Sequence, residues 1–140
     1  MLNADGWRVA ETRAPAAPNP LLVLIDPPFE RRDDARQAVA LAGRLVRRNR
    51  PAVVAVWAPI KDLASFDDLT GTLGDAAGGA PVMIAEVRLR GLDDPMRLNG
   101  CAMAVINPPA GLEAPAAAAA GWIASEIGEA GAVGRVSWLP

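Results

Sequence analysis

Short, fully apolar runs alternate with amphipathic stretches in the first half of the chain. Residues 21–25 and 52–57 are apolar at every position, and between them residues 33–48 repeat apolar side chains at helical spacing with arginines opposite. A run that is apolar on both faces is typical of a strand buried between helix layers. Pro59 closes the second run. The pattern predicts two neighbouring parallel strands joined by a right-handed helical crossover.

The second half predicts a shorter helix, a pair of strands, a long helix and an edge strand. The segments are, in order, 63–73, 82–89 with 101–106, 111–127 and 133–138. The polar connection between the paired strands contains no predicted helix, so we expect an antiparallel hairpin with a long loop. The predicted fold class is α/β, a mostly parallel sheet with a terminal antiparallel hairpin and flanking helices.

Composition limits the chain to one folded unit. With 140 residues, of which 51% are hydrophobic and 21% charged, residues 1–140 fit a single domain with one core. The uncharged apolar stretch 51–60 is far shorter than the roughly 20 residues that a membrane helix needs. Residues 1–5 resemble no secretion signal. We therefore expect a cytoplasmic protein without membrane contact.

The inventory of reactive side chains is short. Cys101 is the single cysteine and the chain has no histidine, so we expect no metal site and neither a Ser-His-Asp nor a Cys-His catalytic arrangement. Carboxylates, backbone carbonyls, lysine and arginine remain for proton handling.

Arginines are concentrated in one region, although the formal net charge of the whole chain is only −2. Seven lie within twenty residues: Arg31, Arg32, Arg36, Arg44, Arg47, Arg48 and Arg50. They form either a solvated helix face or a face that contacts nucleic-acid phosphates.

The tetrapeptide Asp26-Pro27-Pro28-Phe29 follows the first apolar run directly. Ligands of open α/β sheets bind beyond the carboxyl ends of the strands, so Asp26 is expected at a reactive position. The tetrapeptide matches the [Asp/Asn/Ser]-Pro-Pro-aromatic motif of amino-methyltransferases. An amine conjugated to a purine ring is a poor nucleophile, and the Asp26 carboxylate with the Pro27 carbonyl can accept hydrogen bonds from its N–H groups. The prolines stiffen the turn, and Phe29 offers a face for a flipped-out base.

A second strand ends in a similar way, at Asn107-Pro108-Pro109-Ala110. Ala110 replaces the aromatic residue, so we interpret this copy as a structural strand terminus, with lining of the pocket as the alternative.

Further segments match one family in order and spacing. They are Asp5-Gly6-Trp7, 24–30, Trp57-Ala58-Pro59-Ile60, 99–109 and Val136-Ser137-Trp138-Leu139. Nearly the whole chain thus resembles the RlmJ-type family of large-subunit (23S) ribosomal RNA adenine-N6 methyltransferases. The resemblance implies S-adenosylmethionine as cofactor, 23S ribosomal RNA as partner, and Asp26 as the residue that handles the target amine. It also implies that Asp5, Gly6 and Asp26 contact the cofactor. Phe29, where tyrosine is usual, and Ala58, where an aromatic is usual, depart from the family pattern.

The resemblance also implies a missing half. A class I methyltransferase (Rossmann-like) has a glycine-rich loop after its first strand and an acidic residue at the end of its second, and neither is present in this sequence. By resemblance Met1 falls just before the connection of the third to the fourth family strand, so the chain is expected to be the C-terminal half of that fold, without the first cofactor-binding strands. A non-catalytic remnant or binding domain, and a guanine-N2 ribosomal RNA methyltransferase, are the alternatives. The 21–25 strand would then have an unpaired apolar edge, which predicts self-association.

Overall fold

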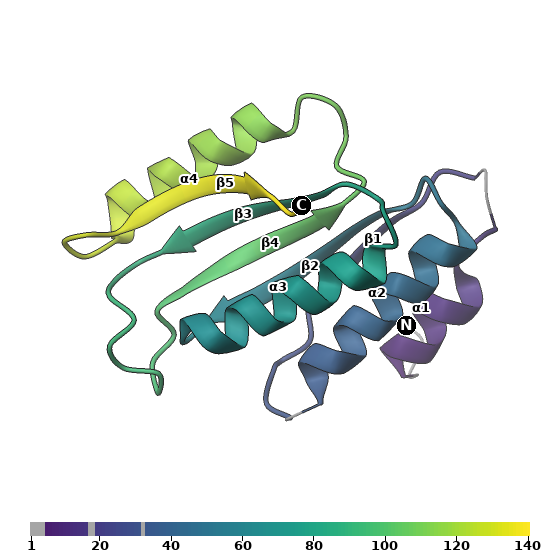
Figure 1. Ribbon diagram of the computed structural model, residues 1–140, viewed down its shortest axis with the longest axis horizontal. Helices are drawn as coiled ribbons and strands as arrows, with labels where there is room; N and C mark the ends of the chain where they lie inside the picture. The colour runs from purple at the N-terminus through teal and green to yellow at the C-terminus, as the bar shows by residue number, and fades with distance from the viewer. Residues whose placement is uncertain (1–4, 17–18, 32) are drawn as a thin grey trace.

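A computed structural model of the protein describes residues 5–16, 19–31 and 33–140. Its elements are, in order, α1 (Gly6–Arg13), β1 (Leu22–Ile25), α2 (Asp34–Arg48), β2 (Val53–Ile60), α3 (Leu63–Ala77), β3 (Val82–Arg88), β4 (Gly100–Ile106), α4 (Glu113–Ile127) and β5 (Val133–Trp138). The five strands form one sheet in the order β1-β2-β4-β3-β5. Figure 1 shows α1, α2 and α3 on one side of this sheet and α4 beside β3 and β5. The α/β prediction is confirmed.

The sheet is mixed, and the expectation of a mostly parallel sheet was wrong. Among the described strands, β1 and β2 are the parallel pair, whereas β2 with β4, β3 with β4, and β3 with β5 are antiparallel. The α3 crossover does connect β2 to a strand of the same direction, but β4 returns between β2 and β3 and separates them. The predicted antiparallel hairpin of β3 and β4 and the edge position of β5 are confirmed.

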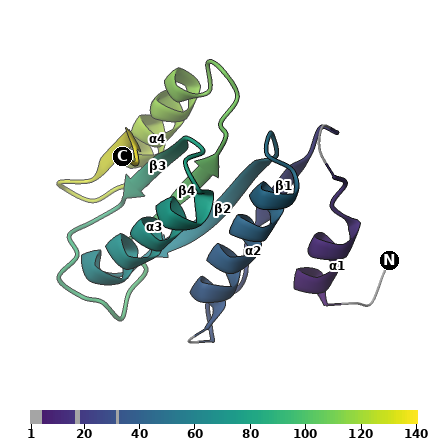
Figure 2. The same ribbon diagram turned by 45° about the vertical axis from the view of Figure 1, so that its right-hand side comes forward.

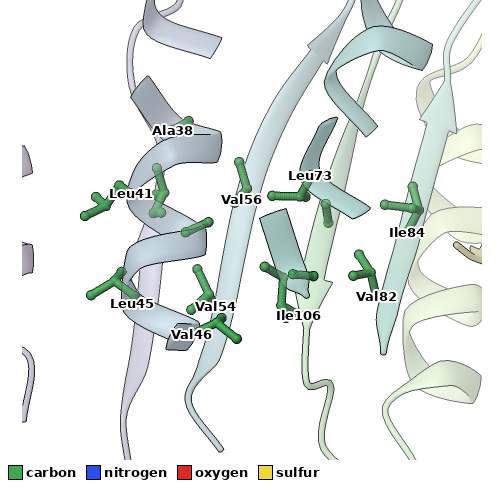
Figure 3. Close-up of a cluster of buried hydrophobic side chains, with 14 of the residues drawn as sticks. Ala38, Leu41, Leu45, Val46, Val54, Val56, Leu73, Val82, Ile84 and Ile106 are labelled. Carbon is green, nitrogen blue, oxygen red and sulfur yellow. The ribbon is translucent and has the colours of Figure 1, made fainter. Parts of the chain in front are cut away.

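The core lies between the sheet and the layer of α2 and α3. Alternate residues of β2, including Val54 and Val56, are fully buried against Leu41 and Leu45 of α2 and Leu73 of α3 (Figure 3). The helical spacing of α2 and the period of two in β2 therefore place their apolar faces together.

The other face of β1 is open, contrary to the expectation of a strand buried on both sides. Leu22 is 73% exposed and Leu24 is 61% exposed, whereas Ile25 is buried. This face of β1 is uncovered because α4 packs against β3 and β5, at the opposite edge of the sheet, through Ala120 and Ala124. In the described residues, β1 pairs with β2 alone.

Two element boundaries differ from the prediction because of tertiary context. β2 continues through Pro59 to Ile60, since pairing with β1 ends at Val56 and Pro59 has a strand partner, Cys101, on one side only. A proline without a donor is tolerated at such an edge. Likewise α3 continues to Ala77, four residues beyond its predicted end at residue 73, and ends at Gly78 with a left-handed φ of 60°.

Helix α1 was not predicted. Asp5 caps it by accepting the N–H of Trp7 at 3.0 Å, but none of its residues is buried. Figure 2 shows α1 at the margin of the molecule, next to α2. Its short length and weak periodicity gave no clear helical signal; its position next to α2 matters for the site.

Candidate functional site

A hollow of about 410 Å³ lies between α1, the end of β1 and the start of α2. Its lining includes Asp5 and Gly6 from the N-terminal segment together with Asp26, Pro27 and Pro28 from the loop after β1. The fold thus brings together two motifs that lie about twenty residues apart in the sequence. Both had been singled out as candidate functional residues.

Asp26 stands open at the carboxyl end of β1. Ile25 before it and Pro27 after it are buried, whereas Asp26 itself is exposed. Within the described residues its carboxylate has neither a hydrogen-bond donor within 3.5 Å nor a cation within 4.0 Å. The buried Ile25 and Pro27 therefore fix the position of Asp26, and its carboxylate oxygens remain available to accept hydrogen bonds from a ligand.

Phe29 does not line this hollow. Its φ is 52°, an uncommon left-handed value for a residue other than glycine, and it turns the chain back so that the half-buried ring packs against Trp57 of β2. The four residues of the motif are therefore divided, with Asp26 to Pro28 at the hollow and Phe29 on the open face of β2.

Asp5 and Gly6 form the opposite wall of the hollow. One oxygen of the Asp5 carboxylate accepts the Trp7 N–H, as an N-cap does, and the other oxygen has no partner among the described residues. Space beside the Gly6 Cα is open, because an added Cβ would meet no atom within 4 Å. This wall can approach a ligand closely.

The hollow also contains residues that the sequence did not single out as site residues. Trp7 and Ala10 of α1, three residues apart, are half-buried on its wall, and their spacing is the signal that could have revealed them. The buried Asp34 accepts the backbone N–H of Arg31 at 3.0 Å, and the Arg31 guanidinium lies 3.4 Å from Asp33. A side-chain hydrogen bond from Gln37 is the main cause that lowers the pKa of Asp33. These contacts brace the loop between Phe29 and α2; Arg32 lies outside the described residues.

The second diproline terminus is structural. Asn107 has a left-handed φ of 54°, and its amide donates to the carbonyls of Arg50 and Ala52 at 2.8 Å and 2.9 Å. Because β4 is antiparallel to β2, these contacts lie at the end of the sheet opposite to Asp26. Pro108 and Pro109 line a different hollow of about 620 Å³, near Glu113 and Trp138. This larger hollow contains none of Asp5, Gly6 and residues 26–29, and Asn107 does not line the Asp26 site.

Two other reactive side chains lie within the sheet, Glu86 of β3 and Cys101 of β4. The buried Glu86 carboxylate binds the guanidinium groups of Arg88 and Arg135. Burial raises the pKa of the Cys101 thiol, and a side-chain hydrogen bond with Trp57 lowers it to a smaller degree. Among the residues that the structure describes, no group of three or more potential metal ligands is present, and no helix is long and apolar enough to span a membrane.

Comparison with known proteins identifies the family of the chain. A family model described as "Ribosomal RNA large subunit methyltransferase D, RlmJ" matches residues 1–140. The chain is 27% identical over 137 residues to the ribosomal RNA large subunit methyltransferase J of Escherichia coli (strain K12), covering 97% of this chain and 49% of that protein.

A solved structure shows the same fold. The crystal structure of protein LPL1258 from Legionella pneumophila, which matches the family model DUF519, superposes with a TM-score of 0.84 at 18% identity, over 96% of this chain and 49% of that one. The chain therefore spans about half the length of the relatives that it matches. Because the family model matches all of residues 1–140, the chain belongs to the RlmJ family of ribosomal RNA large-subunit methyltransferases.

Proposed function

We propose that this chain is the C-terminal catalytic half of an S-adenosylmethionine-dependent methyltransferase that modifies N6 of an adenine in 23S ribosomal RNA. One observation carries the proposal: in a member of this family, the Asp26 carboxylate, which has no partner among the described residues, lines the same hollow as Asp5 and Gly6. The antiparallel return of β4 fits the terminal hairpin expected for a class I methyltransferase. The reaction would take place in the cytoplasm.

The chemistry assigned to Asp26 follows from the weakness of the nucleophile. The lone pair of an adenine amine is delocalised into the ring, so methyl transfer requires a more tetrahedral nitrogen. The Asp26 carboxylate and the Pro27 carbonyl would accept the two N–H groups and stabilise that geometry as positive charge develops on nitrogen. The buried Pro27 and rigid Pro28 would limit movement of these acceptors.

The residues present fit part of a cofactor site. A volume of about 410 Å³ lies within the usual range of small-molecule pockets, roughly 300–1,000 Å³. The free Asp5 carboxylate oxygen suits the adenosine amine, and Gly6 leaves room for it. S-adenosylmethionine would supply the methyl group. No glycine-rich loop follows an early strand in this sequence, so the remaining contacts would come from a polypeptide equivalent to the other half of the relatives.

A hybrid protein tests the proposal. The first half of the Escherichia coli relative, fused ahead of this chain, should produce N6-methyladenosine in 23S ribosomal RNA from a strain that lacks the relative, measured by mass spectrometry of digested nucleosides. The matched Asp26→Ala hybrid, which has no side-chain acceptor at this position, should be inactive while it keeps the same circular dichroism spectrum. Full turnover by the Asp26→Ala hybrid would exclude Asp26 from the mechanism.

The same measurement separates the alternatives. N2-methylguanosine in place of N6-methyladenosine would favour the alternative of a guanine-N2 ribosomal RNA methyltransferase. Phenylalanine, as at Phe29, also occupies the fourth motif position in enzymes of that kind. A well-folded hybrid that transfers no methyl group to ribosomal RNA would favour a non-catalytic domain.

This chain supplies only part of the proposed cofactor site, so its affinity for S-adenosylmethionine should be low. Calorimetric titration of the 140-residue chain with S-adenosylmethionine should show no binding at micromolar concentrations, because a large part of the expected cradle is absent from the sequence. Tight binding would show that this chain alone forms a complete site.

A further inference from the structure

Three arginines form one exposed stripe along α2, which we name the α2 arginine face: Arg36, Arg44 and Arg47. The opposite side of the helix, including Ala38 and Leu45, is buried in the core. Arg36 and Arg47 are eleven residues apart, so their Cα atoms are separated by about 16 Å along the helix axis. The face is therefore long enough to contact an extended ligand.

Most of this charge is not neutralised inside the chain. Arg44 lies 3.1 Å from Glu11 of α1 in a pair whose side chains are both more than 40% exposed. Such an exposed pair is weak and exchangeable. No carboxylate in the described part of the chain lies within 4.0 Å of the Arg36 or Arg47 guanidinium. Two strong donors thus remain available on this surface.

The sequence separates the two signs of charge. Residues 1–50 contain nine arginines and six carboxylates, a formal excess of three positive charges, whereas residues 51–140 contain five basic and ten acidic residues. The neighbouring helix α3 exposes Asp67, Asp68 and Asp75. The excess of positive charge therefore lies in the first fifty residues, which include α1 and α2, although the whole chain is slightly negative.

The α2 arginine face begins beside the candidate site. Asp34, the first residue of α2, is buried at the hollow, and the exposed Arg31 also lines it. Arg36 follows within one turn, and Arg47 lies near the far end of the helix. A strand that enters the hollow with one nucleotide can thus continue along the helix.

We propose that the α2 arginine face binds the phosphate backbone of the RNA substrate and orients the strand toward the Asp26 hollow. This inference rests on the proposed function and extends it to a docking surface. Guanidinium groups bind phosphate oxygens through two parallel hydrogen bonds, and such contacts fix register without reading the base. The choice of target base is left to the hollow.

Two charge-matched variants test the proposal in the 140-residue chain. Arg36→Gln/Arg47→Gln removes two charges from the α2 arginine face and keeps good helix formers. Lys61→Gln/Arg97→Gln removes two charges from exposed positions outside α1 and α2. Binding of a fluorescein-labelled single-stranded RNA is followed by fluorescence anisotropy without cofactor, at salt concentrations from about 50 to 200 mM. Circular dichroism confirms the fold of each variant.

The α2 variant should bind RNA roughly tenfold more weakly at low salt, and the slope of log affinity against log salt should decrease by about 0.7 per arginine removed. The control should remain close to the parent chain in both. If both variants lost RNA affinity equally, the loss would depend on net charge and not on the position of the arginines, and the proposal would be overturned. Failure of the parent chain to bind RNA, or displacement of RNA by polyglutamate at lower concentration than by unlabelled RNA, would also overturn it.

These outcomes are independent of the test of methyl transfer, because no cofactor is present. Arginine-dependent RNA binding together with an inactive hybrid would retain the docking surface and reject the proposed reaction. An active hybrid, together with RNA binding by the 140-residue chain that the Arg36→Gln/Arg47→Gln change does not affect, would retain the proposed reaction and reject the docking surface.

Discussion

The ring of Phe29 lies against the indole of Trp57, with the two centroids 5.8 Å apart and the ring planes at 56°. This tilted geometry is a favourable aromatic contact. It couples the last residue of the diproline motif to the middle of β2, through a backbone conformation that is strained for phenylalanine. The contact therefore belongs both to the fold and to the loop that presents Asp26.

Replacement of Phe29 separates these two contributions. Phe29→Ala loses the aromatic contact and keeps a side chain at φ 52°, whereas Phe29→Gly loses the same contact but relieves the backbone strain. The glycine variant should be more stable than the alanine variant by about 0.5–1 kcal/mol, since relief of the left-handed penalty exceeds the added entropy of unfolded glycine. Urea denaturation of both variants measures the difference. A less stable glycine variant would show that φ 52° carries no strain.

Asp26→Ala should leave the fold intact. The carboxylate is exposed and has no partner in the described residues, so the free energy of unfolding should change by no more than about 0.5 kcal/mol. Thermal unfolding monitored by circular dichroism checks this in the 140-residue chain. Loss of several kcal/mol would show that Asp26 is a structural residue and would remove the basis for its proposed catalytic role.

Asn107 should respond in the opposite way, despite its similar motif. Asn107→Ala removes two amide hydrogen bonds to backbone carbonyls and leaves alanine at φ 54°, so it should cost about 2–3 kcal/mol. Asn107→Gly loses the same hydrogen bonds but tolerates the backbone, and should be intermediate. Denaturant midpoints of the two variants give the order. Indifference to both changes would contradict the structural assignment of this second diproline terminus.

The open apolar edge of the sheet should cause self-association. Leu22 and Leu24 are largely exposed on a strand that pairs only with β2 among the described residues, and unpaired apolar edges recruit other strands. Leu22→Lys/Leu24→Lys should shift the chain toward monomer in light scattering over a concentration series. Met96→Lys/Leu98→Lys, at exposed positions in the loop between β3 and β4, is the matched control. A parent chain that remains a monodisperse monomer at high concentration would refute the prediction.

The N-cap of α3, Asp62, should make the stability of the protein depend on pH in the acid range. Asp62 accepts the backbone N–H of Ser65 at 2.8 Å, and this hydrogen bond is the main cause that lowers the pKa of the Asp62 carboxyl below its usual value. A lowered pKa stabilises the folded state above the unfolded-state pKa, and this contribution is lost as the pH falls through the folded-state pKa. Asp62→Asn should therefore lower the melting temperature at neutral pH and have less effect in strong acid. An equal effect at both pH values would exclude a role for the charge.

Much of the fold could be predicted because its signals are local. The apolar runs of β1 and β2, the helical period of α2 and the hairpin of β3 and β4 depend on side-chain spacing within one segment. Helix α1 could not be predicted, since it is short and buries no residue. The position of β4 between β2 and β3 was not predicted either, because strand order depends on contacts between residues that are distant in the chain.

The sequence by itself determined that a carboxylate, two prolines and an aromatic ring follow the first strand, because covalent order and proline chemistry are local properties. Tertiary structure decided their surroundings. Docking of α1 beside β1 and α2 created the hollow that joins Asp5 to Asp26, and the left-handed turn at Phe29 sent its ring to Trp57 instead. Two similar diproline termini thus reached opposite ends of the sheet, since strand direction is set by pairing between distant segments.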